Sequence, residues 1–441
     1  MRRGRPRPSR GERSGGMGGA LASATAALEL AEARVEITSI AAGGDGVGRA
    51  DGRVLFVPRT APGDIARVRY RAETSARFAH ARLAGLDQAG AARVTPPCPH
   101  YVRDDCGGCQ LQHLAYEAQL AAKAAIIHDA FARIAKRPLG APVVVQPSPE
   151  PWRYRRKISL HLRRIEGGVV AGLHPYHDPS SVFALQDCQI TSTAVNQACR
   201  EIVAAADLLP HSPGLRATVR EVARGVSLVI EGGTQWRVPA ALLDRVPSLQ
   251  AIWWQPHDAG RRLVADRRGD QEPGASFVQV NAVVAAALRA HVVARALALA
   301  PAHASDAYAG AGETALALAE QGVRVTAIEL DRDASRYCAA RLPAGSRSVT
   351  ARVEDELPRA LPADVVIVNP PREGVQSPVT SALNAAAGTA RAIIYISCNP
   401  ATLARDVARL PAWRVAECPA FDMFPHTAHV ETVCVLVPET A

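Results

Sequence analysis

The chain lacks any apolar run of about 18 residues, the length that a helix needs to cross a membrane. It also lacks the apolar core of a secretory signal sequence. These two absences predict a soluble cytoplasmic protein without a membrane partner. Cysteines rarely form disulfides in such a protein, so we expect the nine cysteines to bind metal, do chemistry or fill the core.

Acidic residues are in deficit. The 441 residues include 51 Lys or Arg against 42 Asp or Glu, which gives a formal net charge of +9. A positive balance favours polyanionic partners such as nucleic acid, although it does not bear on the fold. With 48% hydrophobic residues, the chain is long enough for roughly two to four domains.

Short alternating apolar segments follow a basic N-terminal stretch. The first 20 residues are rich in Arg, Gly, Pro and Ser, and we expect a disordered tail over residues 1–32. Residues 33–90 hold β-like runs such as "ARVEITSI" and "GRVLFVP" between Gly-rich turns, which predicts a small β-barrel. Ten arginines against six acids in residues 34–93 favour RNA binding by this barrel, with a solvated structural cap as the alternative.

A cysteine-rich segment comes next and leads into an amphipathic stretch. Residues 114–134 are predicted to form a helix that can pack on the last domain, and residues 143–190 are predicted to form antiparallel strands. We therefore expect a central β-rich domain over residues 91–270. Four cysteines elsewhere lie in apolar contexts and are predicted to be packing residues, namely Cys199, Cys338, Cys418 and Cys434.

One stretch of the central domain is strongly basic. Residues 152–164 hold six Lys or Arg and no acid. On a strand, Arg153, Arg155 and Lys157 would share one face, with Trp152 and Tyr154 interleaved. This pattern favours contact with an RNA backbone whose bases stack on the aromatic rings. The alternative is an edge strand that its charges protect against aggregation.

From residue 271 to 441, strand-like and helix-like segments alternate. This alternation predicts a doubly wound, mainly parallel sheet with ligands at the carboxyl ends of its strands. Gly310 and Gly312 lie between a predicted strand and helix, and Glu329 ends the next strand, where a carboxylate can bind the ribose hydroxyls of an adenosine cofactor. Ala315 stands where a dinucleotide fingerprint has its third glycine, which favours S-adenosylmethionine over NAD. A structural glycine turn with a surface glutamate is the alternative.

Several segments resemble one family in the order that the family has them. These are "CPHYVRDDCGGCQLQH" with the later "QDCQI", "SFVQVN" at 276–281, "NPPREG" at 369–374, "ISCNPATLARD" at 396–406 and "FDMFPHTAHVETV" at 421–433. They resemble the iron–sulfur type of RNA uridine C5-methyltransferase, which acts on bacterial 23S ribosomal RNA. The N-terminal barrel is similar to the TRAM module of those enzymes. The resemblance implies a Rossmann-like catalytic domain, a central iron–sulfur domain, and a monomer with RNA as its partner.

The resemblance also implies the binding sites. Methyl-donor contacts fall on Gln279, Tyr308, Glu329 and Asn369, beside the two glycines. Four cysteines match the ligands of a [4Fe–4S] cluster, namely Cys98, Cys106, Cys109 and Cys188. A structural zinc ion is the alternative occupant of four thiolates.

Cys398 and Glu431 carry the chemistry that the resemblance implies. A thiolate adding to C6 of uracil makes C5 enolate-like, so that C5 can attack a sulfonium methyl group. A general base must then remove the C5 proton before the thiolate can leave, and Glu431 matches that base. The target base must also be unstacked from its RNA context.

Of two departures from the family, one keeps another function open. Asn369 stands where the family usually has Asp, so cytosine C5 methylation is an alternative, although an Asn amide still suits uracil. Ala309 replaces a Cys of the glycine loop, with little expected consequence. The other alternative is an RNA-binding protein without catalysis, against which the presence of both Cys398 and Glu431 argues.

Overall fold

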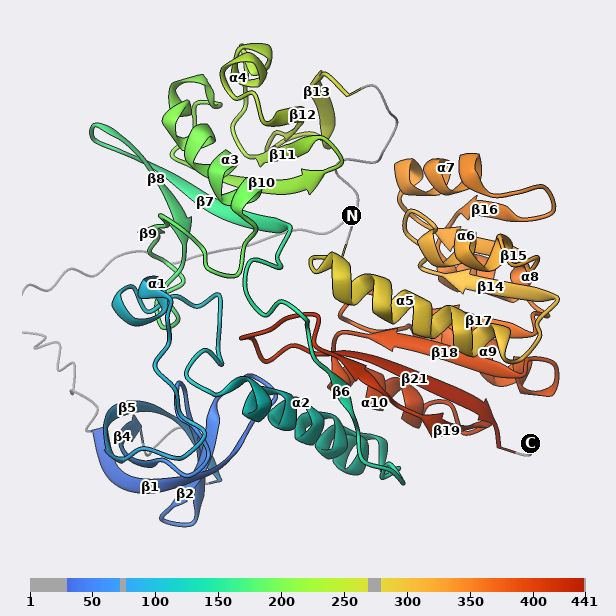
Figure 1. Cartoon of the computed structure of the whole chain (residues 1–441), viewed down its shortest axis with the longest axis horizontal. Helices are drawn as coiled ribbons and strands as arrows, with labels where there is room; N and C mark the ends of the chain where they lie inside the picture. Colours follow the sequence, from blue (N-terminus) through green and yellow to red (C-terminus); the bar gives the residue numbers. More distant parts are fainter. Residues whose placement is uncertain (1–29, 72–76, 269–278, 440–441) are drawn as a thin grey trace, which may run out of the picture.

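A computed structural model describes residues 30–71, 77–268 and 279–439. The predicted tail lies almost wholly outside these residues. Figure 1 shows a small barrel, a central sheet with helices beside it, and a larger layered α/β part that ends the chain. No helix in the described ranges is both long and apolar enough to span a bilayer.

The N-terminal barrel confirms the prediction of a small β-barrel. Five strands close in the order β1-β2-β3-β5-β4. Alternate side chains such as Val35, Ile37 and Leu55 fill its interior, as the two-residue period of a strand requires. The strands are β1 Leu30–Ile40, β2 Gly46–Ala50, β3 Arg53–Val57, β4 Ile65–Arg71 and β5 Phe78–Gln88.

Two helices connect the barrel to the rest of the chain. The short helix α1 (Pro99–Arg103) follows the first cysteine, and α2 (Tyr116–Ala130) continues into a π-helical turn at Phe131–Ala135. The predicted 114–134 helix is therefore present. Ile127 and Phe131 are buried in the same core as the sheet of the C-terminal α/β part, so α2 packs on the last domain, as Figure 1 shows.

The central sheet has seven strands, and helices cover one of its faces. Its order is β13-β12-β11-β10-β7-β8-β9. Helices α3 (Thr193–Ala204) and α4 (Pro239–Arg245) pack on the face that holds Leu160, Leu228 and Ile252. The strands are β7 Lys157–Ile165, β8 Gly168–Leu173, β9 Phe183–Ala184, β10 Gly214–Val222, β11 Gly225–Glu231, β12 Leu249–Gln255 and β13 Arg262–Asp266, with a 3-10 turn at Ala206–Leu208.

The basic stretch before β7 does not form the strand face that the sequence predicts. β7 begins only at Lys157, and Arg153 has a positive φ of 56°. Arg153 instead pairs with Asp187 at 2.6 Å. Tyr154 is buried and its hydroxyl donates to the Pro425 carbonyl at 3.0 Å, so its ring cannot stack on an RNA base. The prediction of alternating Arg and aromatic side chains on one exposed strand is wrong.

The catalytic sheet is doubly wound, as predicted. Its order is β16-β15-β14-β17-β18-β21-β20-β6, with β19 also paired to β21. Its strands are β6 Val145–Gln146, β14 His303–Ala307, β15 Arg324–Glu329, β16 Arg347–Thr350, β17 Val365–Val368, β18 Ala392–Ser397, β19 Trp413–Glu417, β20 Ala420–Phe421 and β21 Glu431–Pro438.

Helices cover both faces of this sheet. One core contains α5 and α6, and the other contains α8, α9, α10 and the incoming α2. β6 comes from the segment predicted to hold antiparallel strands, yet it pairs in parallel with β20 at the edge of the catalytic sheet. The helices are α5 Ala282–Leu297, α6 Glu313–Ala319, α7 Arg332–Arg341, α8 Val353–Ala360, α9 Ser377–Ala385 and α10 Pro400–Ala408, with a 3-10 turn at Ala386–Gly388.

Candidate active site

Five strands of the catalytic sheet meet at one edge and bring most of the predicted site residues into a row. β15, β14, β17 and β18 are parallel neighbours, so Glu329, Tyr308, Asn369 and Cys398 lie at or just beyond their carboxyl ends. β21 runs antiparallel to β18 and starts at the same edge with Glu431. Three inter-strand spacings separate Glu329 from Cys398, which is roughly 15 Å.

At one end of the row, Glu329 holds the glycine loop. Its Oε2 accepts from the Gly310 N–H and its Oε1 from the Asp331 N–H, both at 2.8 Å. Gly310 has φ 58°, and a Cβ built there meets nothing within 4 Å. The loop therefore leaves open space beside a carboxylate, where an adenosine ribose can be bound.

The second glycine serves packing rather than ligand approach. Gly312 has φ 83°, and a Cβ there would lie 2.1 Å from the Cys338 sulfur of α7. Cys338 itself is buried, in agreement with its predicted packing role. Cys199 and Cys434 are also buried, and Cys418 is partly buried.

The structure also describes the three other residues that were predicted to bind the methyl donor. Tyr308 is partly buried with φ 62°, and burial raises the pKa of its hydroxyl. The Asn369 N–H donates to the Ala307 carbonyl at 3.1 Å, which fixes the start of the 369–374 loop against β14. Gln279 lies just before α5 and is partly buried, whereas residues 276–278 of its segment lie outside the described ranges.

At the other end of the row, Cys398 is half-buried between β18 and α10. The Asn399 side chain accepts from the backbone N–H groups of Ala401 and Thr402, which starts α10 directly after the cysteine. Burial and the nearby Glu431 raise the pKa of the Cys398 thiol, while the charge and a hydrogen bond of the Arg372 side chain oppose this shift. The thiol is thus held beside one cation that favours its thiolate.

Glu431 lies across from the cysteine. The β18–β21 register pairs Ser397 with Thr432, so the residues one step further, Cys398 and Glu431, face each other. Glu431 is only 3% exposed, and burial raises the pKa of its carboxyl to about 8, with Arg372 opposing the shift. A carboxyl with this pKa can exchange a proton near neutral pH.

Arg372 and Asp406 also lie at this edge of the sheet, and the sequence reasoning did not single them out. The Arg372 carbonyl accepts from the Thr402 hydroxyl at 3.2 Å. Asp406 is fully buried and accepts from the Tyr395 hydroxyl at 2.8 Å and the Val375 N–H at 2.9 Å. These bonds fix the Arg372 loop to α10. The signal was available, since both residues lie inside the segments "NPPREG" and "ISCNPATLARD".

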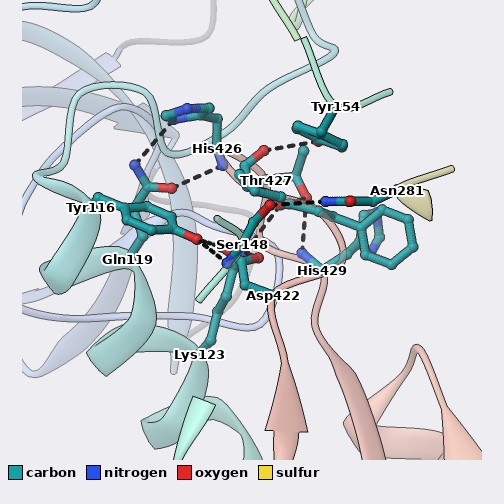
Figure 2. A network of polar contacts seen from close by, with 12 residues as sticks. Tyr116, Gln119, Lys123, Ser148, Tyr154, Asn281, Asp422, His426, Thr427 and His429 are labelled. Carbon is teal, nitrogen blue, oxygen red and sulfur yellow. Dashed lines mark hydrogen bonds and ion pairs between the residues drawn. The ribbon is translucent and has the colours of Figure 1, made fainter. Parts of the chain in front are cut away.

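The loop before Glu431 is anchored by α2, as Figure 2 shows. Lys123 and Asp422 are both fully buried and pair at 2.5 Å, and the Tyr116 hydroxyl donates to the other Asp422 oxygen at 2.8 Å. The Gln119 side chain accepts from the His426 N–H at 2.9 Å. A helix from outside the catalytic domain thus holds the strand that carries Glu431.

Two histidines lie in the loop before Glu431, and of these His426 is buried whereas His429 is exposed. Burial lowers the pKa of His426 to about 4, so its ring is neutral at physiological pH. The Trp152 ring stacks on His426 with centroids 3.7 Å apart. One face of the Trp152 ring is therefore covered by the His426 ring.

Four predicted cysteine ligands line one cavity of about 230 Å³, namely Cys98, Cys106, Cys109 and Cys188. All four are free thiols, and the Gly108 N–H donates to the Cys106 sulfur at 3.4 Å. Among the described residues, no group of three or more His, Cys, Asp or Glu side chains is gathered closely enough to hold a single metal ion. The backbone N–H groups of Gln110 and Leu111 both donate to the His426 carbonyl, so the cysteine loop touches the loop before Glu431.

Two family models match parts of the chain. The model described as tRNA (Uracil-5-)-methyltransferase matches residues 344–439, which include Asn369, Cys398 and Glu431. The TRAM domain model matches residues 28–83, the region of the barrel.

Relatives and a solved structure cover almost the whole chain. A protein of Thermosynechococcus vestitus named as an RNA methyltransferase is 31% identical over 91% of this chain and 97% of its own length. One of Protochlamydia amoebophila, named likewise, is 32% identical over 90% and 96%. The fold is similar to that of Pyrococcus abyssi tRNA (uracil-54, C5)-methyltransferase, solved with S-adenosyl-L-homocysteine, at a TM-score of 0.66 and 24% identity over 92% of this chain and 99% of that one. The chain therefore belongs to the family of S-adenosylmethionine-dependent RNA (uracil-5-)-methyltransferases with an N-terminal TRAM domain.

Proposed function

We propose that this enzyme methylates C5 of a uridine in 23S ribosomal RNA, in the cytoplasm and as a monomer, through a covalent adduct on Cys398. The observation that carries the proposal is the pairing of Cys398 with Glu431 across β18 and β21, at the edge where Gly310 and Glu329 leave room for the donor. A thiol and a buried carboxyl on neighbouring β-strands are placed to act on one nucleobase held between them.

The donor would occupy the edge formed by β15, β14 and β17. Glu329 would accept hydrogen bonds from the ribose hydroxyls, and the open face of Gly310 would let the ligand approach the backbone. Tyr308, Gln279 and Asn369 would bind the rest of the donor. Gly312 shapes the loop through its contact with α7.

The reaction would proceed in three steps. The Cys398 thiolate forms a bond to C6, and the electrons of the C5–C6 double bond move toward the O4 carbonyl. C5 then attacks the methyl group, and the sulfonium–methyl bond breaks to leave S-adenosylhomocysteine. Glu431 finally takes the C5 proton, the double bond re-forms, and the thiolate leaves. Arg372 stabilises the anionic forms of both groups.

We further propose that the four cysteines hold an iron–sulfur cluster rather than zinc. Thiolates that share one zinc ion must converge on a single atom, whereas those of a [4Fe–4S] cluster each bind a different iron and stand further apart. The proposed cluster rests on four cysteine thiols that line one cavity. Methyl transfer from this donor consumes no electron, so a bound cluster would have a structural role. It would crosslink the cysteine loop to the residues around Cys188.

Asn369 makes cytosine a second candidate base. An amide offers one donor and one acceptor, and it can face either the N3–H and O4 of uracil or, when flipped, the N3 and N4 amino group of cytosine. Transcripts that hold uridine or cytidine at the same position separate the two substrates.

The test is an RNA that contains 5-fluorouridine, incubated with labelled methyl donor. Fluorine replaces the C5 proton, so Glu431 has nothing to remove and a labelled protein–RNA adduct accumulates. We expect the adduct with wild type and none with Cys398→Ala. Its absence from wild type on every fragment of 23S ribosomal RNA would overturn the proposal.

A further inference from the structure

The outer surface of the N-terminal barrel differs from strand to strand. On β1 and β4 the outward side chains include Glu32 and Arg69, which form an ion pair at 2.6 Å. On β3 and β5 three rings face outward instead, namely Phe56, Phe78 and His80, since the residues that alternate with them fill the barrel interior. The β3–β5 register places Phe56 opposite His80, and Phe78 lies two residues before His80 on the same face of β5.

The three rings pack on one another and remain open to solvent. The ring centroids of Phe56 and His80 are 5.4 Å apart, with 29° between their planes. Phe78 forms T-shaped contacts with both, 6.2 Å from Phe56 and 6.3 Å from His80. Phe78 is 47% exposed and the His80 side chain is 73% exposed. We call these three residues the ring patch.

The barrel does not depend on the ring patch for its own core. That core is formed by inward side chains such as Val35, Ile37 and Leu55, and a half-exposed ring gains little from burial. Neighbouring apolar side chains that stay exposed mark interaction sites. An exposed aromatic ring offers a flat face on which a nucleobase can stack, whatever the base.

Arginines border the ring patch. In the registers of the three strands, Arg49 on β2 lies opposite Val54 on β3, which lies opposite Phe78 on β5. Arg82 lies two residues beyond His80 on the same face of β5. Both arginines are exposed. Guanidinium groups beside stacking rings suit a single strand of nucleic acid, whose phosphates and bases alternate along the chain.

The β1–β2 turn lies between the ring patch and the active site. Asp45 in this turn has a carboxylate oxygen 3.9 Å from a ring nitrogen of His80. The neighbouring Gly44 has φ 92°, and a Cβ there would lie only 3.2 Å from the Cβ of Ala428. Ala428 stands three residues before Glu431. A strand of RNA on the ring patch can therefore continue over this turn toward the active site.

We infer that the ring patch binds unpaired nucleotides of the RNA substrate that flank the target base. Bases stack on Phe78 and His80, while Phe56 supports both rings from the barrel surface. Arg49 and Arg82 bind the phosphates beside them. The ring patch reads no base identity, and it selects unpaired over paired RNA because the bases of a duplex already stack on their neighbours. This inference rests on the proposed function only for the identity of the RNA.

RNA binding by the full-length enzyme, measured without methyl donor, tests the ring patch. The probe is a fluorescently labelled, unpaired RNA of mixed sequence and roughly 16 nucleotides, the upper end of the site sizes of single-strand-binding barrels. We expect Phe78→Ala to raise Kd by about fivefold or more, and Phe78→Ala with His80→Ala by about 25-fold or more. The same RNA annealed to its complement should bind wild type and the double variant equally. The slope of log Kd against log salt should not change, because the rings bind no phosphate.

Two controls separate stacking from apolar contact and from folding. Phe78→Trp keeps a ring face and should keep the wild-type Kd, whereas Phe78→Leu is apolar without a ring and should behave as Phe78→Ala. Ile134→Ala removes a side chain that is 44% exposed in the π-helical turn after α2, and it should leave Kd unchanged. All these variants should melt at the wild-type temperature, because each changes a side chain that is largely in solvent.

The inference is overturned if the Phe78→Ala, His80→Ala double variant binds unpaired RNA with the Kd of Ile134→Ala, which would point to a protein partner for the ring patch. It is also overturned if the double variant loses affinity for unpaired and duplex RNA alike. It stands, and the proposed function fails, if only binding of unpaired RNA is lost while wild type forms no adduct with any 5-fluorouridine fragment of 23S ribosomal RNA. Binding and adduct formation are separate measurements, so the two failures are distinguishable.

Discussion

The two ends of the active-site row differ in what holds their carboxyl groups. At the donor end, Glu329 accepts two backbone N–H groups, both from the catalytic domain. At the nucleophile end, Glu431 is buried and its pKa is raised to about 8, and the loop before it depends on α2 and on the cysteine loop. The first arrangement suits ground-state binding by a fixed charge. The second suits a base that changes its protonation state, in a geometry that the rest of the chain controls.

The largest expected effect comes from removing the base at the nucleophile end. Glu431→Gln cannot take the C5 proton, so natural RNA should be methylated once and stay attached to Cys398. Turnover should fall by about 10²–10⁴-fold, and a labelled adduct should appear on denaturing gels without 5-fluorouridine. Glu439→Gln, at the exposed far end of the same strand, should turn over normally. Free methylated RNA produced at the wild-type rate by Glu431→Gln would remove Glu431 as the base.

The same contrast decides what could be predicted from sequence. Glu329 ends a buried strand, Cys398 directly follows one and Gly310 lies three residues beyond one, and parallel strands bring such positions to one edge. The local sequence pattern was therefore sufficient to predict that these three residues lie at the same edge of the sheet. Glu431 required the resemblance, because only the antiparallel register of β21 brings its first residue beside the end of β18.

Features that depend on distant pairing could not be predicted. Lys157 and Arg220 are far apart in the chain, and only the β7–β10 register places them opposite each other. The turn at Arg153 ended the predicted basic strand face early, because that residue adopts a positive φ and pairs with Asp187. Likewise, nothing local to Val145 and Gln146 indicates that they join the catalytic sheet. Periodicity gives faces within one element, whereas pairing between elements is set by the whole fold.

The second prediction concerns a variant in α2 that should affect the nucleophile end of the active-site row and not the donor end. Lys123→Met leaves Asp422 buried without its partner, which should lower the free energy of unfolding by about 3–5 kcal/mol. In the molecules that remain folded, adduct formation should fall while donor binding persists, because Glu329 and Gly310 do not contact α2. Urea denaturation and calorimetric titration of the donor measure the two effects.

Two further variants serve as controls for this second prediction. Replacing both partners, as in Lys123→Met with Asp422→Leu, should recover much of the lost stability, since no buried charge is left unpaired. Lys136→Met removes an exposed lysine just after the same helical segment and should change neither quantity. Equal losses of donor binding and adduct formation in Lys123→Met would contradict the separation of the two ends.

The third prediction concerns the donor end alone. Glu329→Gln removes the charge that would bind the ribose hydroxyls, and Kd for S-adenosylmethionine should rise about tenfold, as for the loss of a charge-assisted hydrogen bond. Addition of Cys398 to 5-fluorouridine RNA in the absence of donor should be unaffected. Glu320→Gln, at the exposed end of α6, is the control for loss of one carboxylate. A loss of adduct in Glu329→Gln would show that the two ends are not independent.

The smallest expected effect tests how Arg372 tunes the base. Only the carboxylate form of Glu431 can take the proton, so product release from the preformed adduct should rise with pH, about tenfold per unit, and level off above about pH 8. Arg372 lowers the pKa of Glu431 against the effect of burial. Arg372→Met should therefore move the midpoint to higher pH and slow release severalfold at pH 7, with little change above the new midpoint. Arg372→Lys keeps the positive charge and should keep the wild-type midpoint. The rate of single-turnover release is measured from pH 6 to pH 10 (about two units on either side of the midpoint). The same pH profile for wild type, Arg372→Met and Arg372→Lys would contradict this role of Arg372.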